Sequence, residues 1–219
     1  MGLPFVTVKF AQSLDGRIAT ATGDSQWISS DASRRFAHKL RRDHDAILVG
    51  IGTVLADDPE LTVRLVRGRD SVRIVLDSRL RIPLTARVLA NVAASRTLVA
   101  TSETPDMNKA REIEKLGAEV LRLASPPDHS GVNITRLLEE LGGRGIASVL
   151  VEGGRSVITS MLAARAVDRL VVVIAPKIIG EGTEAIGDLG ITRLNEALTF
   201  SSVQTRRLGP DIIFDGRLK

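Results

Sequence analysis

Seven short runs of mostly apolar residues constrain the fold of this chain more than any other feature of its sequence. Near-continuous apolar runs of this length are typical of strands that are buried on both faces of a sheet. The pattern therefore predicts a largely parallel sheet. The predicted strands occupy residues 5–11, 46–50, 73–77, 97–101, 119–123, 148–152 and 170–175.

Helical patterns separate several of these runs. In the first, Ala32, Phe36 and Leu40 recur at the spacing of one helix face. Two others end at glycines, which commonly close a helix. The alternation predicts an α/β fold, with helices on both faces of a mostly parallel central sheet. The predicted helices occupy residues 30–41, 108–116, 133–141 and 156–164.

The C-terminal part follows a different pattern. Residues 200–207 and 212–215 flank the sequence Leu-Gly-Pro-Asp, which favours a turn. We expect an antiparallel hairpin at one edge of the sheet. The 219 residues contain no repeat or low-complexity linker, so a single domain over residues 1–219 is predicted. Residues 124–133, with two prolines, are predicted to form a surface loop.

Composition excludes several classes of function. The chain has no cysteine, which excludes disulfides, thiolate catalysis and cysteine-bound metals. His38, His44 and His129 show no metal-ligand spacing, so we interpret them as solvated or helix-end residues and predict no metal site. The net charge of +4 is spread along the chain, and only 3% of residues are aromatic, which argues against nucleic-acid binding.

The sequence also argues against a membrane protein. No apolar run approaches the roughly 18 residues that a membrane-spanning helix needs. The N-terminal residues do not show the basic and apolar regions of a signal peptide. We therefore expect a cytoplasmic protein that does not bind membranes.

Two candidate segments follow the first strand. Lys9 lies in that strand and precedes the sequence SLDGR, residues 13–17. Taken alone, this segment is more typical of a structural turn than of a site. Residues 24–30 contain the only tryptophan, Trp27, ahead of a helix that Ser30 or Asp31 can cap.

Two further segments combine strand ends with glycines. In residues 49–64, Gly50 and Gly52 lead into a short helix whose free amides favour an anion. The third glycine of the dinucleotide-binding fingerprint is absent. In residues 150–156, a buried strand ends at Glu152, and two glycines and a helix follow.

Glu152 carries the strongest functional signal in this part of the sequence. Open parallel sheets bind ligands at the carboxyl ends of their strands. An unpaired carboxylate at the end of a buried strand would be costly, so we favour a site over an ordinary turn. Residues 175–182, another strand end with glycines, are typical of a loop when taken alone.

Together, the order and spacing of these segments resemble the riboflavin-biosynthesis reductase family, which shares the dihydrofolate reductase fold. The most specific match combines VGIGTVLADDPELTV with SLDGR and VEGG. The resemblance implies a three-layer dihydrofolate reductase-like fold and an NAD(P)H-dependent oxidoreductase. Its reaction would be NADPH-dependent reduction of the ribosyl group of a ribosylaminopyrimidine 5′-phosphate to a ribitylamino chain, without a metal. NADH is a possible second donor, and a homodimer is implied.

The same resemblance suggests roles for individual residues. Lys9 and Glu152 are the catalytic candidates, as polar partners of the opening ribose. Arg41 and Arg64 suit the substrate phosphate, because a guanidinium can hold two phosphate oxygens. The implied cofactor contacts are Ala11, Trp27, Gly52, Thr53, Asp57, Ser78, Arg79, Gly154, Arg155 and Ser156. The implied substrate contacts are Ser25, Arg41, Leu61, Arg64 and Glu152.

The resemblance leaves the substrate open. The segments VGIGTVLADDPELTV and RIVLDSRLRIPLTARVL match the stand-alone archaeal type, which reduces 2,5-diamino-6-ribosylamino-4(3H)-pyrimidinone 5′-phosphate. Ser25 and Trp27 also resemble the bacterial domain, whose substrate is 5-amino-6-(5-phosphoribosylamino)uracil. A non-catalytic nucleotide-binding module is a third alternative. Arg79 or Arg81 is a candidate partner for the 2′-phosphate of NADPH.

These hypotheses share one spatial requirement. The loops after the strands that end at Ala11, Gly50 and Glu152 must meet around a cleft wide enough for two phosphate-bearing ligands. If Glu152 and Asp57 lay on opposite sides of the molecule, the reductase hypothesis would be wrong.

Overall fold

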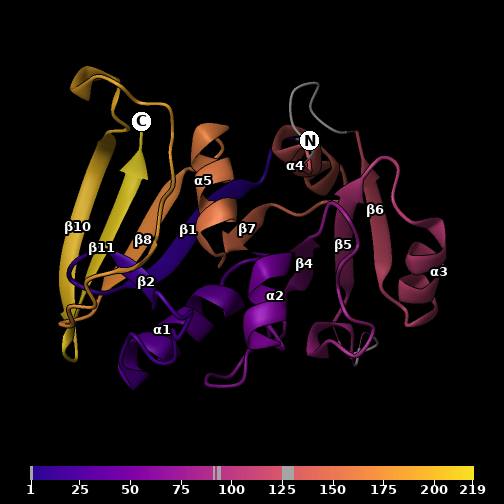
Figure 1. The fold of residues 1–219 in the computed structure, drawn as a ribbon, viewed down its shortest axis with the longest axis horizontal. Coiled ribbons are helices and arrows are strands. Elements are labelled where there is room, and N and C mark those ends of the chain that lie inside the picture. The colour runs from indigo at the N-terminus through magenta and orange to yellow at the C-terminus, as the bar shows by residue number, and fades with distance from the viewer. Residues whose placement is uncertain (1, 91, 93–94, 125–130) are drawn as a thin grey trace.

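A nine-stranded sheet forms the centre of the computed structural model, which describes residues 2–90, 92, 95–124 and 131–219. The strand order is β10-β11-β8-β1-β7-β3-β4-β5-β6. Figure 1 shows the sheet crossing the molecule from β10 at one side to β6 at the other, with α5 over its middle. A second sheet joins β2 and β9.

The element boundaries place Glu152 directly after a strand, and they place Thr53 and Ser156 in helices that begin at strand ends. The strands are β1 (Phe5–Gln12), β2 (Arg17–Thr20), β3 (Ala46–Gly50), β4 (Val72–Leu76), β5 (Thr97–Ser102), β6 (Glu119–Leu123), β7 (Ser148–Val151), β8 (Arg169–Ile174), β9 (Gly182–Glu184), β10 (Phe200–Leu208) and β11 (Asp211–Leu218). The helices are α1 (Asp31–Arg42), α2 (Ile51–Asp57), α3 (Met107–Lys115), α4 (Ile134–Gly143) and α5 (Arg155–Ala163), with short 3-10 turns η1 (Arg87–Leu89) and η2 (Leu194–Glu196).

The sheet buries both of its faces, as the apolar runs predict. Alternate residues of the central strands point to opposite faces. On one face, Val8 and Leu48 pack in a cluster with side chains of α4 and α5. On the other, Ile47 packs with α2 and α3, and Leu150 packs with Leu40 of α1. The three-layer α/β architecture is therefore confirmed.

The sequence located the predicted helices and strands to within one or two residues, except the last strand, which spans Asp211–Leu218 and not only 212–215. Neighbouring strands from β8 to β6 pair in parallel, and β10 and β11 form the predicted antiparallel hairpin, which joins the sheet through β8. The short strands β2 and β9 were not predicted. Within the predicted loop at 124–133, residues 125–130 lie outside the described residues.

A buried carboxylate fastens the hairpin to the start of α1. Asp211 Oδ2 accepts hydrogen bonds from the Ser30 amide at 2.9 Å and from the hydroxyls of Ser30 and Ser33 at 2.7 and 2.5 Å. Ser30 is the N-cap residue, one of the two that the sequence allows. The C-terminal hairpin therefore fixes the helix that carries Arg41.

None of the helices in the described ranges combines the length and the apolar composition that a membrane crossing requires.

Candidate functional site

Lys9 and Glu152 are neighbours because of the strand register. Val8 of β1 pairs with Val151 of β7 in parallel, so the next residues stand side by side at the carboxyl end of the sheet. Both lie on the face that α1 covers, since Leu150 packs against Leu40 of that helix. Two strands far apart in the sequence thus bring the two catalytic candidates together.

Arg41 joins this pair from α1. Its Nη2 and Nε donate to the two carboxylate oxygens of Glu152 at 2.6 and 3.1 Å. Its Nη1 donates to the Thr62 carbonyl at 3.2 Å. The Arg41 and Glu152 side chains are 14% and 12% exposed. In this structure Arg41 is therefore a structural partner of Glu152, whereas the sequence suggested a phosphate ligand.

Burial and mutual charge govern ionisation in this cluster. Desolvation lowers the pKa of Lys9, against the opposing effect of the Glu152 carboxylate. Burial alone would raise the pKa of Glu152, but Arg41 and Lys9 together outweigh it, so that pKa lies below its ordinary value. The carboxylate stays charged, while the ammonium of Lys9 gives up its proton more readily than a solvated lysine.

His38 also belongs to this cluster, although the sequence placed it on the surface or at a helix end. It lies inside α1 and is only 5% exposed. Its Nδ1 accepts a hydrogen bond from the Arg64 amide at 3.2 Å. Burial, together with the charges of Arg41 and Arg64, lowers the pKa of His38 to about 4. Helical spacing was the one indication in the sequence that His38 is buried, because this residue is adjacent to Ala37 of the apolar helix face.

The segment after α2 returns to the cluster. The Leu61 side chain is buried and its φ is +57°, so only its main chain can face a ligand. Arg64 is half-exposed, and its Nη1 lies 3.7 Å from Glu60. Of the two arginines predicted to hold the phosphate, Arg64 is the more available.

The helices α2 and α5 begin side by side. A Cβ at Gly50 would lie 2.6 Å from Val157 Cγ2, and one at Gly154 would lie 3.8 Å from Thr53 Oγ1. Both helices have a glycine N-cap with no side-chain cap among the described residues. Their first amides are therefore available to an anion.

The other predicted cofactor residues surround these helix starts. Gly52 is exposed, and no described atom lies within 4 Å of the position its Cβ would take. Ser156 is exposed, and Arg155 Nη2 lies 3.6 Å from Glu184 of β9. Ala11 is half-buried near the end of β1, beside Val173 of β8.

The loop that carries Trp27 bridges several elements. Gln26 Nε2 donates to Asp57 Oδ1 at 3.3 Å, at the end of α2. Lys177 Nζ donates to the Trp27 carbonyl at 2.6 Å, and the Arg34 guanidinium lies 4.4 Å from the Trp27 ring centre. Ser25 is half-buried in the same loop. Asp57 therefore lies on the Trp27 side of α2, joined to the loop that follows β2.

The SLDGR turn has a structural role. The Asp15 carboxylate accepts the Ser13 hydroxyl at 2.6 Å and the Gly180 amide at 2.6 Å. These hydrogen bonds, with one from Ile179, lower the pKa of Asp15 to about 2. The turn thereby fixes the loop at 175–182, which supplies Lys177. Sequence reasoning missed Lys177 and Gln26, because their contacts depend on loops that only the tertiary structure brings together.

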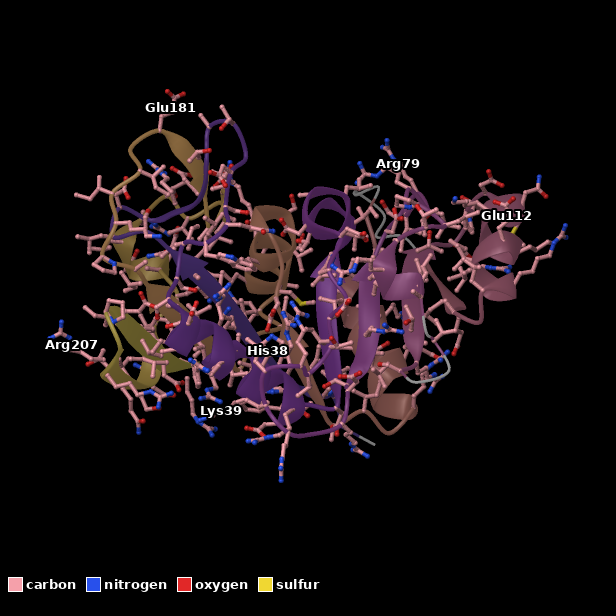
Figure 2. The ribbon with its side chains drawn as sticks, turned by 90° about the horizontal axis from the view of Figure 1, so that it is seen from below. His38, Lys39, Arg79, Glu112, Glu181 and Arg207 are labelled. Atoms are coloured by element: carbon pink, nitrogen blue, oxygen red, sulfur yellow. The ribbon has the colours of Figure 1, made fainter. Side chains whose placement is uncertain are left out.

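Ser78 and Arg79 follow β4, farther along the sheet. The Ser78 carbonyl accepts the Ser102 hydroxyl at 2.8 Å. Arg79 is exposed, and Figure 2 shows it pointing outward at the side of the molecule opposite Lys39. Its guanidinium is thus accessible, at the strand end next to β3.

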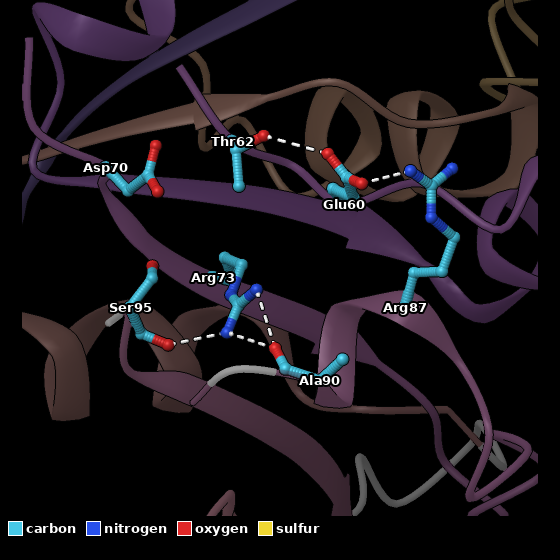
Figure 3. A pocket seen from close by; sticks show the side chains of 7 residues that line it. All are labelled: Glu60, Thr62, Asp70, Arg73, Arg87, Ala90 and Ser95. Atoms are coloured by element: carbon cyan, nitrogen blue, oxygen red, sulfur yellow. Dashed lines mark hydrogen bonds and ion pairs between the residues drawn. The ribbon is translucent and has the colours of Figure 1, made fainter. Parts of the chain in front are cut away.

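A cavity of about 270 Å³ opens beside Thr62 and Arg73 (Figure 3). Within it, Arg73 Nη2 donates to the Ser95 carbonyl at 2.6 Å. Thr62 forms the boundary with the cluster, since its carbonyl accepts from Arg41. The strands β1, β7 and β3 are neighbours in the sheet, but the lining of this cavity includes none of the predicted site residues. The lining residues are Glu60, Thr62, Asp70, Arg73, Arg87, Ala90 and Ser95.

Curated relatives resemble the chain over almost its whole length. A riboflavin biosynthesis protein RibD from Aquifex aeolicus is 44% identical over 211 residues, which cover 96% of this chain and 56% of the relative. A 2,5-diamino-6-ribosylamino-4(3H)-pyrimidinone 5′-phosphate reductase from Methanothermobacter thermautotrophicus is 39% identical, with 99% of each chain covered. The chain thus spans about half the length of the first relative and nearly all of the second.

Solved structures support the fold. A deaminase and 5-amino-6-(5-phosphoribosylamino)uracil reductase from Thermotoga maritima has a TM-score of 0.76 and 30% identity, covering 99% of this chain and 57% of that chain. Dihydrofolate reductase from Enterococcus faecalis, at 13% identity and a TM-score of 0.51, covers 98% of this chain and 96% of its own, and confirms the dihydrofolate reductase-like fold alone. The family model of the RibD C-terminal domain matches residues 4–214, so the chain belongs to that family.

Proposed function

We propose that the chain is an NADPH-dependent reductase of riboflavin biosynthesis that acts on 2,5-diamino-6-ribosylamino-4(3H)-pyrimidinone 5′-phosphate. The observation that carries this proposal is the buried cluster of Lys9, Arg41 and Glu152 at the carboxyl ends of β1 and β7. Family membership supports the reaction class. The archaeal reductase, which matches this chain from end to end, supports the diamino substrate.

The residues at the helix starts fit a dinucleotide. A Cβ at Gly154 would lie 3.8 Å from Thr53 Oγ1, so the start of α5 borders Thr53 of α2. Thr53, Gly154 and Ser156 would hold phosphate groups, and Ser78 with Arg79 would contact the adenosine end. When bound, NADPH would supply a hydride to C1′ of the opened ribose.

Lys9 and Glu152 would then control the proton transfer to the ribose that ring opening requires. Ring opening breaks the C1′–O4′ bond, leaves an iminium at C1′ and requires a proton at O4′. Lys9, whose pKa burial lowers, is suited to donate that proton. Glu152, held by Arg41, keeps Lys9 in place and offers its carboxylate to the ribose hydroxyls. Arg64 would bind the 5′-phosphate.

The bacterial substrate is the second candidate. The 5-amino-6-(5-phosphoribosylamino)uracil reductase from Thermotoga maritima shares 30% identity with this chain. The two substrates differ at the pyrimidine ring, whereas the cluster faces the ribose. The ring specificity therefore has to be measured.

The test incubates the purified chain with NADPH and each pyrimidine phosphate, and follows the loss of NADPH absorbance. We expect turnover of the diamino compound, and a loss of about 100-fold or more in kcat for Glu152→Gln. Circular dichroism would show that the variant is folded. Turnover of the uracil compound alone would overturn the substrate assignment. NADPH binding without turnover of either compound would favour the nucleotide-binding module.

A homodimer is also part of the proposal. The strand β10 lies at the edge of the sheet, with its residues mostly exposed. An unpaired edge strand of this length is a natural surface for a second copy.

A further inference from the structure

His38 occupies a position unlike that of its neighbours on α1. Figure 2 labels His38 near the middle of the molecule, whereas Lys39 points outward. His38 is buried and Lys39 is exposed. A buried histidine needs a partner for its ring nitrogens, because an unpaired polar group away from water is costly.

The partner is the main chain of Arg64. The Arg64 amide donates to Nδ1 of His38 at 3.2 Å, so that nitrogen is an acceptor and the ring proton lies on Nε2. Since the pKa of His38 is about 4, the ring remains neutral and keeps this acceptor at neutral pH.

Three consecutive residues of the same segment are fixed in this way. The Thr62 carbonyl accepts from Arg41, and the Val63 amide donates to Asp70 Oδ1 at 2.6 Å. The Arg64 amide, bound by His38, is the third. The main chain is therefore held by a hydrogen bond at each of residues 62–64, while the Arg64 side chain remains 52% exposed.

We infer that His38 is a positioning residue that holds the Arg64 main chain so that its guanidinium meets a phosphomonoester in the site. The inference rests on the proposed function for the identity of that ligand, the substrate's 5′-phosphate. His38 itself does not contact the phosphate. Its effect is exerted through the conformation of residues 62–64.

The test compares two substitutions. In His38→Asn the amide oxygen takes nearly the place of Nδ1 and can accept from Arg64, whereas in His38→Gln the amide lies one bond farther away. His44→Asn is the matched control, because within the described residues the ring of His44 is hydrogen-bonded to the Thr7 hydroxyl and the Leu40 carbonyl and not to Arg64. The probe is ribose 5-phosphate, with binding measured by calorimetry.

We expect His38→Gln to weaken ribose 5-phosphate binding about tenfold, as the loss of one hydrogen bond implies. His38→Asn and His44→Asn should remain within about threefold of the wild type. In turnover, His38→Gln should raise KM for the pyrimidine phosphate and leave kcat nearly unchanged, because the phosphate contact exists before the reaction begins.

Hydrogen exchange separates this inference from the proposed function. The Arg64 amide should exchange faster in His38→Gln than in His38→Asn, whether or not the chain is a reductase. If the wild type binds ribose 5-phosphate but turns over neither pyrimidine, the proposed function fails and the inference stands. If His38→Gln binds ribose 5-phosphate as well as His38→Asn does, or if the wild type does not bind it, the inference is wrong.

Discussion

Three charges and one neutral ring share a small volume between β1, β7 and α1. The cluster is stable because each buried charge has an opposite charge beside it: Arg41 binds both oxygens of Glu152, and Lys9 stands next to that carboxylate. Breaking such a pair leaves an unpaired buried ion, which is far more costly than the pair itself. His38 fits this group only because it is uncharged.

The neutrality of His38 has a measurable effect on stability. Its pKa falls from an ordinary 6.5 to about 4 in the folded chain. Between these values the unfolded chain binds a proton that the folded chain does not bind. The stabilisation is therefore complete above pH 6.5 and is lost as the pH falls toward 4.

We expect the free energy of unfolding to fall by about 2 kcal/mol more in the wild type than in His38→Asn, between about pH 7.5 and about pH 5. Urea titrations at both pH values measure it. The charged groups around His38 are the same in both proteins, so their own titration changes the stability of the wild type and of His38→Asn by similar amounts. They are Lys9, Arg41, Arg64 and Glu152. Equal losses in the two proteins would contradict the pKa assignment.

At the scale of elements, the packing of α5 against the end of β3 requires a residue without a side chain at position 50. Gly50 and Gly153 both abut Val157, whose branched side chain has little freedom to move. A methyl group at Gly50 would push Val157, and with it α5, away from α2. The spacing of the two helix starts, where the cofactor is proposed to bind, would change with it.

We expect Gly50→Ala to cost about 1–3 kcal/mol of stability, and much less when it is combined with Val157→Ala, which removes the clashing Cγ2. A double-mutant cycle measured by denaturant unfolding gives the coupling. Gly52→Ala is the control: this helical position has free space, so alanine should be neutral or slightly stabilising. Simple additivity of the Gly50 and Val157 changes would contradict the contact.

The link between the hairpin and α1 can be tested separately. Asp211→Ala leaves the amide of Ser30 and the hydroxyls of Ser30 and Ser33 without their acceptor, so we expect a loss of about 2–4 kcal/mol. Thermal unfolding measures it. Asp188→Ala, at an exposed loop position, should change stability by less than about 1 kcal/mol. Similar losses at both positions would contradict the structural role of Asp211.

Elements were predictable where one local signal dominated. Buried strands such as 46–50 need apolar side chains on both faces, and that need is visible in the sequence. The strands β2 and β9 were not predictable, because they are short, half-buried and paired with each other across more than half of the chain. Likewise, the order of residues placed Glu152 at a strand end, but only the fold could show that Arg41 binds it.

For the whole molecule, the open edge of the sheet is the feature that matters for assembly. Val203 of β10 is half-exposed there. If two copies pair through this edge, Val203→Lys should convert a two-chain species into a single chain, because the charge would be buried in the contact. Light scattering measures the mass. Leu194→Lys, at a position outside the strand, is the control and should leave the mass unchanged. A wild-type mass equal to that of one chain would contradict the homodimer.

The position of β1 in the sheet has a consequence for how the protein is made. It precedes the strands beside it in the sequence by more than 130 residues, since Phe5 pairs with Ser148 and Thr7 with Arg169. Lys9 is therefore synthesised well before either of the strands that flank β1. The pairing of such distant segments slows folding. The candidate site thus forms late, and a nascent chain released before β7 would contain β3, β4, β5 and β6 but neither of the strands that flank β1 in the sheet.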